Sequence, residues 1–93
     1  MQNPAGKSMM QTVTIYTKST CPYCHKAKGL LNAKHVTFTE HDVTRDPDSF
    51  ERMAALSGRR TVPQVFIGSR HVGGCDDLHA ADANGTLDRW LAA

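Results

Sequence analysis

The sequence predicts a layered α/β domain with the element order β-α-β-α-β-β-α. Its 93 residues are enough for one small domain and too few for two. Hydrophobic residues make up 40% of the chain, which suits a single modest core and argues against a disordered polypeptide. Short stretches of alternating polar and apolar residues also give way repeatedly to stretches with helical periodicity, as is typical of α/β architecture.

The first elements are two strands with a helix between them. Residues 12–17 alternate and are rich in β-branched side chains, so they predict the first strand. In residues 22–34, apolar side chains recur at helical spacing between lysines, which predicts an amphipathic helix. Residues 36–39 alternate again and predict the second strand.

A second helix is predicted to begin after Asp46 and to end at Gly58. Asp46 is a favourable N-cap, and Pro47 suits the first helical position because its missing N–H would have no partner there. Gly58 can adopt the left-handed conformation with which many helices end.

The last third of the chain predicts a hairpin followed by short helices. Residues 64–67 and 70–72 flank Gly68-Ser69, a two-residue turn of the kind that joins antiparallel strands. Short helices are expected near residues 76–83 and 87–91.

Composition excludes several classes of protein. The longest apolar runs fall far short of the roughly 20 residues that a membrane span needs. No basic segment followed by an apolar stretch opens the chain, and no run of five like charges suggests nucleic-acid binding. Residues 1–11 are polar and aperiodic, so we expect a flexible extension or a cloning remnant before a folded domain at 12–93. The expectation is a cytoplasmic domain that binds neither nucleic acid nor membrane.

A pair of cysteines lies between the first strand and the first helix, in Cys21-Pro22-Tyr23-Cys24. Cys21 falls at the helix N-terminus, where unpaired N–H groups and the positive end of the helix dipole favour an anion. The thiolate is the nucleophilic form of cysteine, so this position predicts an attacking sulfur. Cys24 follows one turn later on the same face and can attack a mixed disulfide formed at Cys21.

Two other interpretations of the cysteine pair remain open. Cys-x-x-Cys is also half of many zinc sites, but such sites need a second pair, and only Cys75 remains in this chain. The five histidines are scattered and match no usual ligand spacing. A buried structural pair is the other alternative, although the motif enters a basic helix from a loop.

Three spaced motifs together resemble the dithiol glutaredoxins of bacteria. They are residues 16–24, Thr61-Val62-Pro63, and Gly73-Gly74-Cys75-Asp76-Asp77, and the resemblance covers residues 12–91. It implies a thioredoxin fold, in which helices flank a four-stranded mixed β-sheet, and a cis peptide bond before Pro63. It also implies glutathione as co-substrate, with no tightly bound cofactor and no metal.

The resemblance further implies the residues of the site. Cys21 and Cys24 would be catalytic and would form a redox-active disulfide. Residues 73–77 would receive the γ-glutamyl end of glutathione, Lys18 would meet its glycyl carboxylate, and Cys75 would be a spectator thiol. The implied glutathione-binding set is Lys18, Tyr23, Arg60, Thr61, Val62, Pro63, Gly74, Cys75 and Asp76.

The implied activity is glutathione-dependent thiol–disulfide exchange by a monomer. Its partners would be glutathionylated or disulfide-containing proteins, with ribonucleotide reductase as one candidate. One alternative is a thioredoxin-like redoxin reduced by a reductase, although the sequence lacks the Trp-Cys-Gly-Pro-Cys of thioredoxins. The other is a non-enzymatic iron–sulfur carrier, although relatives specialised for that role have Cys-Gly-Phe-Ser where this chain has Cys-Pro-Tyr-Cys.

Overall fold

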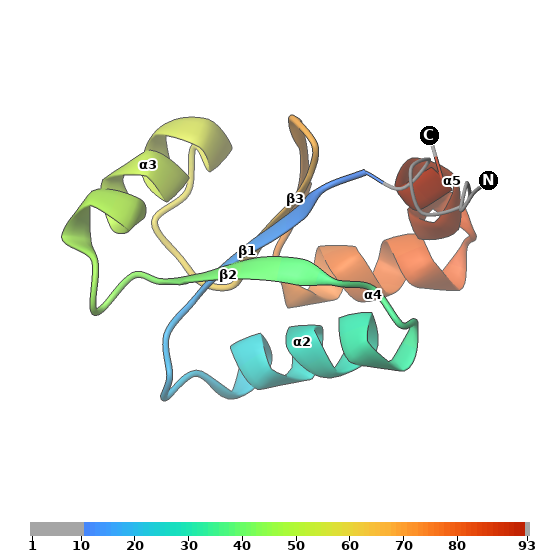
Figure 1. The fold of residues 1–93 in the computed structure, drawn as a ribbon, viewed down its shortest axis with the longest axis horizontal. Helices are drawn as coiled ribbons and strands as arrows, with labels where there is room; N and C mark the ends of the chain where they lie inside the picture. The colour runs from blue at the N-terminus through green and yellow to red at the C-terminus, as the bar shows by residue number, and fades with distance from the viewer. Residues whose placement is uncertain (1–10, 93) are drawn as a thin grey trace, which may run out of the picture.

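Four strands form one mixed sheet in the order β2-β1-β3-β4 in a computed structural model that describes residues 11–92 (Figure 1). β1 pairs in parallel with β2 and antiparallel with β3, and β3 pairs antiparallel with β4. This sheet confirms the α/β class that the alternating pattern predicts. The elements are β1 (Val13–Thr17), α2 (Pro22–Ala33), β2 (Phe38–Asp42), α3 (Pro47–Ser57), β3 (Gln64–Ile67), β4 (Arg70–Gly73), α4 (Cys75–Ala83) and α5 (Thr86–Ala92).

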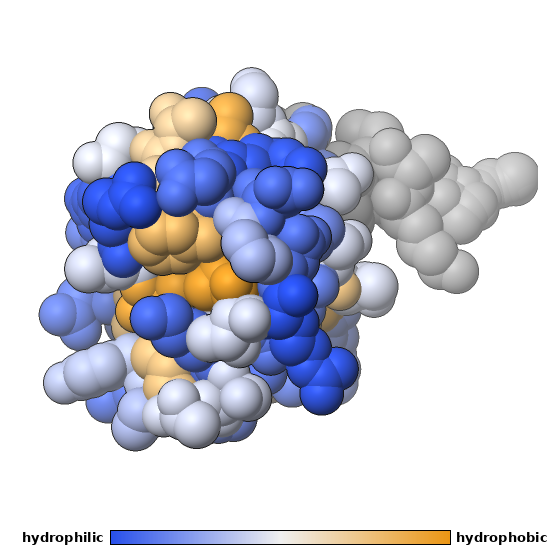
Figure 2. Space-filling view, turned by 90° about the vertical axis from the view of Figure 1, so that its left-hand side faces the viewer, coloured by the Kyte–Doolittle hydropathy of each residue, from blue (hydrophilic) through white to orange (hydrophobic). Residues whose placement is uncertain are grey.

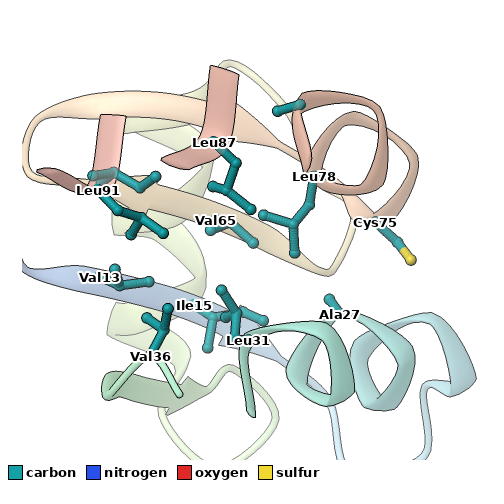
Figure 3. Close-up of a cluster of buried hydrophobic side chains, with 12 residues drawn as sticks. Val13, Ile15, Ala27, Leu31, Val36, Val65, Cys75, Leu78, Leu87 and Leu91 are labelled. Atoms are coloured by element: carbon teal, nitrogen blue, oxygen red, sulfur yellow. The ribbon is translucent and has the colours of Figure 1, made fainter. Parts of the chain in front are cut away.

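Helices cover both faces of the sheet: α2 and α4 lie on one face and α3 on the other (Figure 1). Side chains of β1 alternate between the two faces, because successive residues of a strand point to opposite sides. Val13 and Ile15 belong to the larger core cluster beneath α2 and α4, whereas Tyr16 packs in a smaller cluster with Met53 of α3. In Figure 3, Cys75 lies at one end of the larger cluster.

The second strand differs from its predicted position. Residues 36–39 were expected to form it, but β2 runs from Phe38 to Asp42. Val36 is buried and donates its N–H to the carbonyl of Leu31 in α2. It therefore belongs to the turn that follows α2 and not to the strand. β2 is an edge strand, paired on one side by β1, and this position tolerates its polar residues. Glu40 accepts hydrogen bonds from Thr17 (2.6 Å) and Lys28 (2.9 Å).

The ends of α3 confirm the capping prediction. The Asp46 side chain accepts hydrogen bonds from the N–H of Asp48 (3.1 Å) and the hydroxyl of Ser49 (2.7 Å). Pro47 occupies the first turn, and Gly58 ends the helix with a φ of 71°. The helix therefore stops where the chain turns toward β3.

The other boundaries match the prediction or differ from it by one residue. α4 begins at Cys75 and α5 at Thr86, each one residue earlier than expected. The N–H of Gln11 donates to the carbonyl of Leu91 in α5 (3.1 Å). Residues 1–10 of the predicted extension lie outside the described residues. Within residues 11–92, none of the helices has the length and apolar character needed to cross a membrane.

Candidate active site

Cys21 is the N-cap of α2, and its sulfur takes the place of a capping oxygen. The Sγ atom accepts a hydrogen bond from the backbone N–H of Cys24 (3.2 Å). Pro22 occupies the first helical position, as predicted. The N–H groups of the first turn have no partner within the helix, so a negatively charged sulfur is stabilised at this point. The structure therefore confirms the predicted placement of Cys21 at the helix N-terminus.

Cys24 lies in a very different environment from Cys21. Its side chain is completely buried, whereas Cys21 is partly exposed. Burial, together with the hydrogen bond to Cys21, raises the pKa of Cys24 to about 12. Cys24 is thus held as a neutral thiol beside a sulfur that solvent can reach.

The loop before β3 faces the exposed sulfur. The Val62-Pro63 peptide bond is cis, as the family resemblance implies. The Sγ atom of Cys21 lies 3.9 Å from the carbonyl oxygen of Val62, with the thiol as donor. The backbone of this loop therefore borders the reactive position, while Pro63 itself is buried.

A cleft of about 230 Å³ opens at this end of the sheet. In Figure 2, which looks at the end where β1 leads into α2, apolar surface lies at the centre and hydrophilic side chains surround it. All predicted glutathione-binding residues except Lys18 and Arg60 line the cleft. The complete lining is Tyr23, Arg59, Thr61, Val62, Pro63, Gln64, Gly74, Cys75, Asp76 and Asp77.

The two neighbouring arginines have separate surroundings. The guanidinium of Arg60 lies 4.7 Å from the centre of the Phe50 ring and pairs with Glu51 at 3.2 Å. Arg59 lines the cleft instead and pairs with Asp77 at 3.1 Å. The family resemblance implied Arg60, and not Arg59, as a glutathione-binding residue.

Asp77 organises the turn that leads into α4. Its carboxylate accepts a hydrogen bond from the N–H of Gly74 (3.0 Å) as well as from Arg59. The Gly74 hydrogen bond first, and then Arg59, lower the pKa of Asp77. Gly73 precedes the turn with a φ of 123°, a conformation that L side chains rarely adopt. Asp77 thus holds the turn, and Asp76 remains exposed at the cleft.

Lys18 and Cys75, two further predicted site residues, lie just before α2 and at the start of α4. Lys18 is half-buried in the loop before α2, where its carbonyl accepts the N–H of Cys21 (3.2 Å). Cys75 is buried at the start of α4, and burial raises the pKa of its thiol. Its role as a spectator stays a prediction. Among the described residues, no group of three or more His, Cys, Asp or Glu side chains could hold a metal ion.

A mixed sheet with a dithiol at the start of its first helix and a cis-proline loop opposite defines a thiol–disulfide oxidoreductase of the thioredoxin fold. Comparisons with known proteins narrow this class. The sequence profile named Glutaredoxin matches residues 13–72. The chain belongs to the glutaredoxin family.

Individual glutaredoxins are similar to this chain over most of its length. The chain is 56% identical to Glutaredoxin 3 of Escherichia coli K12 over 82 residues, which is 88% of this chain and 99% of that protein. The solution structure of glutaredoxin from Brucella melitensis matches with a TM-score of 0.79 and 50% identity, covering 90% of this chain and 91% of the other. A crystal structure of a buckwheat glutaredoxin–glutathione complex matches with the same TM-score, at 28% identity over 87% of this chain and 76% of the other.

Proposed function

We propose that the protein uses glutathione to reduce protein–glutathione mixed disulfides and protein disulfides in the cytoplasm. The observation that carries this proposal is the position of Cys21, whose partly exposed sulfur caps α2 and faces the carbonyl of Val62 beside the cleft. A reducing compartment keeps such a dithiol available for exchange. The buckwheat relative, crystallised as a complex with glutathione, supports glutathione as the ligand.

The cleft and its surroundings suit a short peptide that has a carboxylate at each end. We place the backbone of the glutathione cysteine against Val62, where an extended peptide can pair with the loop. The γ-glutamyl carboxylate would lie at the start of α4, where N–H groups and the helix dipole favour an anion, and its ammonium would meet Asp76. Tyr23 and Lys18 would lie toward the glycyl end.

The reaction with a glutathionylated protein has two exchange steps. The Cys21 thiolate attacks the glutathionyl sulfur, the original disulfide breaks, and the protein leaves as a thiolate that takes up a proton. A second glutathione thiolate then attacks the glutathionyl sulfur on Cys21. Glutathione disulfide forms, and Cys21 returns as a thiolate.

Protein disulfides require the second cysteine. Attack by Cys21 leaves a mixed disulfide with the target protein and releases one target thiolate. Cys24, losing its proton as it attacks, displaces the second target thiolate and closes a Cys21–Cys24 disulfide. Two glutathione molecules then restore the dithiol and leave as glutathione disulfide.

A coupled assay tests this function. Purified protein is supplied with glutathione, glutathione reductase and a glutathionylated peptide, and consumption of NADPH is followed. We expect turnover that depends on the protein and disappears in Cys21→Ser. An absence of turnover by the unaltered protein, with its thiols shown to be reduced, would rule the proposal out.

A further inference from the structure

Gln64 bridges the cis-proline loop to strand β4. It follows Pro63 as the first residue of β3, and its side chain is buried, with 1% of the residue exposed. The amide nitrogen donates to the carbonyl oxygen (3.1 Å) and the hydroxyl (3.3 Å) of Thr61. The amide oxygen lies 2.7 Å from Nε2 of His71 on β4. From the sequence, Gln64 is predicted only as the first residue of a strand.

The direction of each hydrogen bond in this bridge follows from the carbonyl of Thr61. A carbonyl oxygen can only accept, so the amide nitrogen of Gln64 must face it. The amide oxygen then faces His71, and Nε2 of His71 must therefore carry a hydrogen and donate it. His71 thus supports the amide orientation that the carbonyl of Thr61 selects.

The orientation of the Thr61 carbonyl also sets the orientation of the Val62 N–H. The C=O of Thr61 and the N–H of Val62 belong to one planar peptide unit, and in a trans unit they point in opposite directions. Because Gln64 holds the carbonyl inward, the N–H of Val62 is directed outward, away from the protein interior. This N–H and the Val62 carbonyl are the groups with which an extended peptide would pair.

We propose that Gln64, oriented by His71, is a positioning residue that presents the Val62 peptide to substrate. The proposal rests on the proposed function, since glutathionylated substrate is what the Val62 backbone would bind. Gln64 and His71 make no hydrogen bond to the Cys21 sulfur, so they act through the loop. Their loss should therefore weaken substrate binding while the thiol keeps its reactivity.

Substitutions at His71 separate hydrogen bonding from packing. The ring of His71 lies 5.0 Å from the ring of Phe66, so His71→Phe keeps an aromatic ring there and removes the donor. His71→Gln does the opposite, because a glutamine amide can replace the Nε2 donor but not the ring. His41→Phe is the matched control: His41 stacks on Tyr16 at 5.1 Å, on the opposite edge strand β2.

The first measurement is steady-state kinetics with a glutathionylated peptide, together with the rate at which iodoacetamide alkylates Cys21. We expect His71→Phe to raise KM about 3- to 10-fold, the range for loss of one hydrogen bond, with kcat and the alkylation rate little changed. His71→Gln and His41→Phe should keep a KM near that of the unaltered protein. The proposal is overturned if His71→Phe has an unaltered KM, or if His71→Gln is the more impaired of the two.

A second measurement does not depend on turnover. In the free protein, the amide resonance of Val62 should shift in His71→Phe but not in His71→Gln or His41→Phe. If the unaltered protein fails to turn over the glutathionylated peptide, the proposed function is wrong, yet this comparison still decides the role of Gln64. An unchanged Val62 amide in His71→Phe would overturn the positioning role.

Discussion

The backbone N–H of Cys24 donates a hydrogen bond to the Sγ atom of Cys21 across 3.2 Å. One residue thereby stabilises negative charge on the first sulfur while its own thiol lies in the interior. Burial, with the Cys21 hydrogen bond, raises the pKa of Cys24 to about 12, so the two thiols are unequal before any substrate arrives. In the proposed function, this inequality favours Cys21 for the first attack and leaves Cys24 to act once a mixed disulfide has formed.

Serine substitutions test that division of labour. Cys21→Ser should abolish turnover of both glutathionylated peptide and protein disulfide. Cys24→Ser should retain turnover of the glutathionylated peptide, because free glutathione can still attack the disulfide on Cys21. It should lose more than about tenfold in reduction of a protein disulfide, since the tethered thiol acts at a high effective concentration. Equal loss of both activities in Cys24→Ser would refute the assignment. The backbone N–H of residue 24 is present in this variant, so its hydrogen bond to the Cys21 sulfur can still form.

The charge on Asp77 should make stability depend on pH. The N–H of Gly74 and then Arg59 lower the pKa of Asp77 below its ordinary value of 3.8, so the unfolded chain takes up the proton first as pH falls. The stability that Asp77 contributes is therefore fully present above that value and is lost as pH decreases through the lowered pKa. Urea denaturation at a series of pH values below about 5 should show a shallower loss for Asp77→Asn than for the unaltered protein. Identical slopes for Asp77→Asn and the unaltered protein would contradict the prediction.

A pair of glycine substitutions should move stability in opposite directions. Gly73 has a φ of 123°, and a Cβ there would collide with the carboxylate of Asp77. Gly73→Ala should therefore lower the free energy of unfolding by more than about 1 kcal/mol. Gly29 lies in α2 with nothing within 4 Å of an added Cβ, so Gly29→Ala should raise it by about 0.5–1 kcal/mol. Chemical denaturation measures both, and a Gly73→Ala protein as stable as the original would show that the turn can move.

Local signals in the sequence predicted the features that depend on neighbouring residues. Asp46 and Gly58 cap α3 as expected, and Cys21 caps α2, because capping is decided within a few positions of the chain. The extent of β2 was not predictable in the same way. Glu40 is held there by Thr17 and Lys28, which approach from other elements.

In the candidate site too, features set by neighbouring residues were predicted, and features set by contacts between elements were not. The cysteine pair and the loop around Pro63 were predicted from their motifs. The structure places the Cys21 sulfur against the carbonyl of Val62, and both Val62 and Pro63 line the cleft. Gln64 was missed because its partner His71 lies across the hairpin on β4. Which of two adjacent arginines faces the cleft likewise depends on where α4 places Asp77.

That choice between arginines gives a last prediction. Arg59 lines the cleft and is half-exposed, so its guanidinium can meet a carboxylate of glutathione while it remains near Asp77. Arg59→Ala should raise KM for a glutathionylated peptide about 3- to 10-fold, the range for loss of a hydrogen bond worth about 1 kcal/mol in a half-exposed cleft. Arg60→Ala removes the same charge one residue away, from a position over Phe50 and beside Glu51. Its ion pair is exposed, so this variant should lose less than about 1 kcal/mol of stability and keep KM within about twofold.

Raising the ionic strength should reduce the difference in KM between the unaltered protein and Arg59→Ala, because salt screens an exposed charge. If Arg60→Ala raised KM more than Arg59→Ala did, the cationic contact of the cleft would have to be reassigned to Arg60.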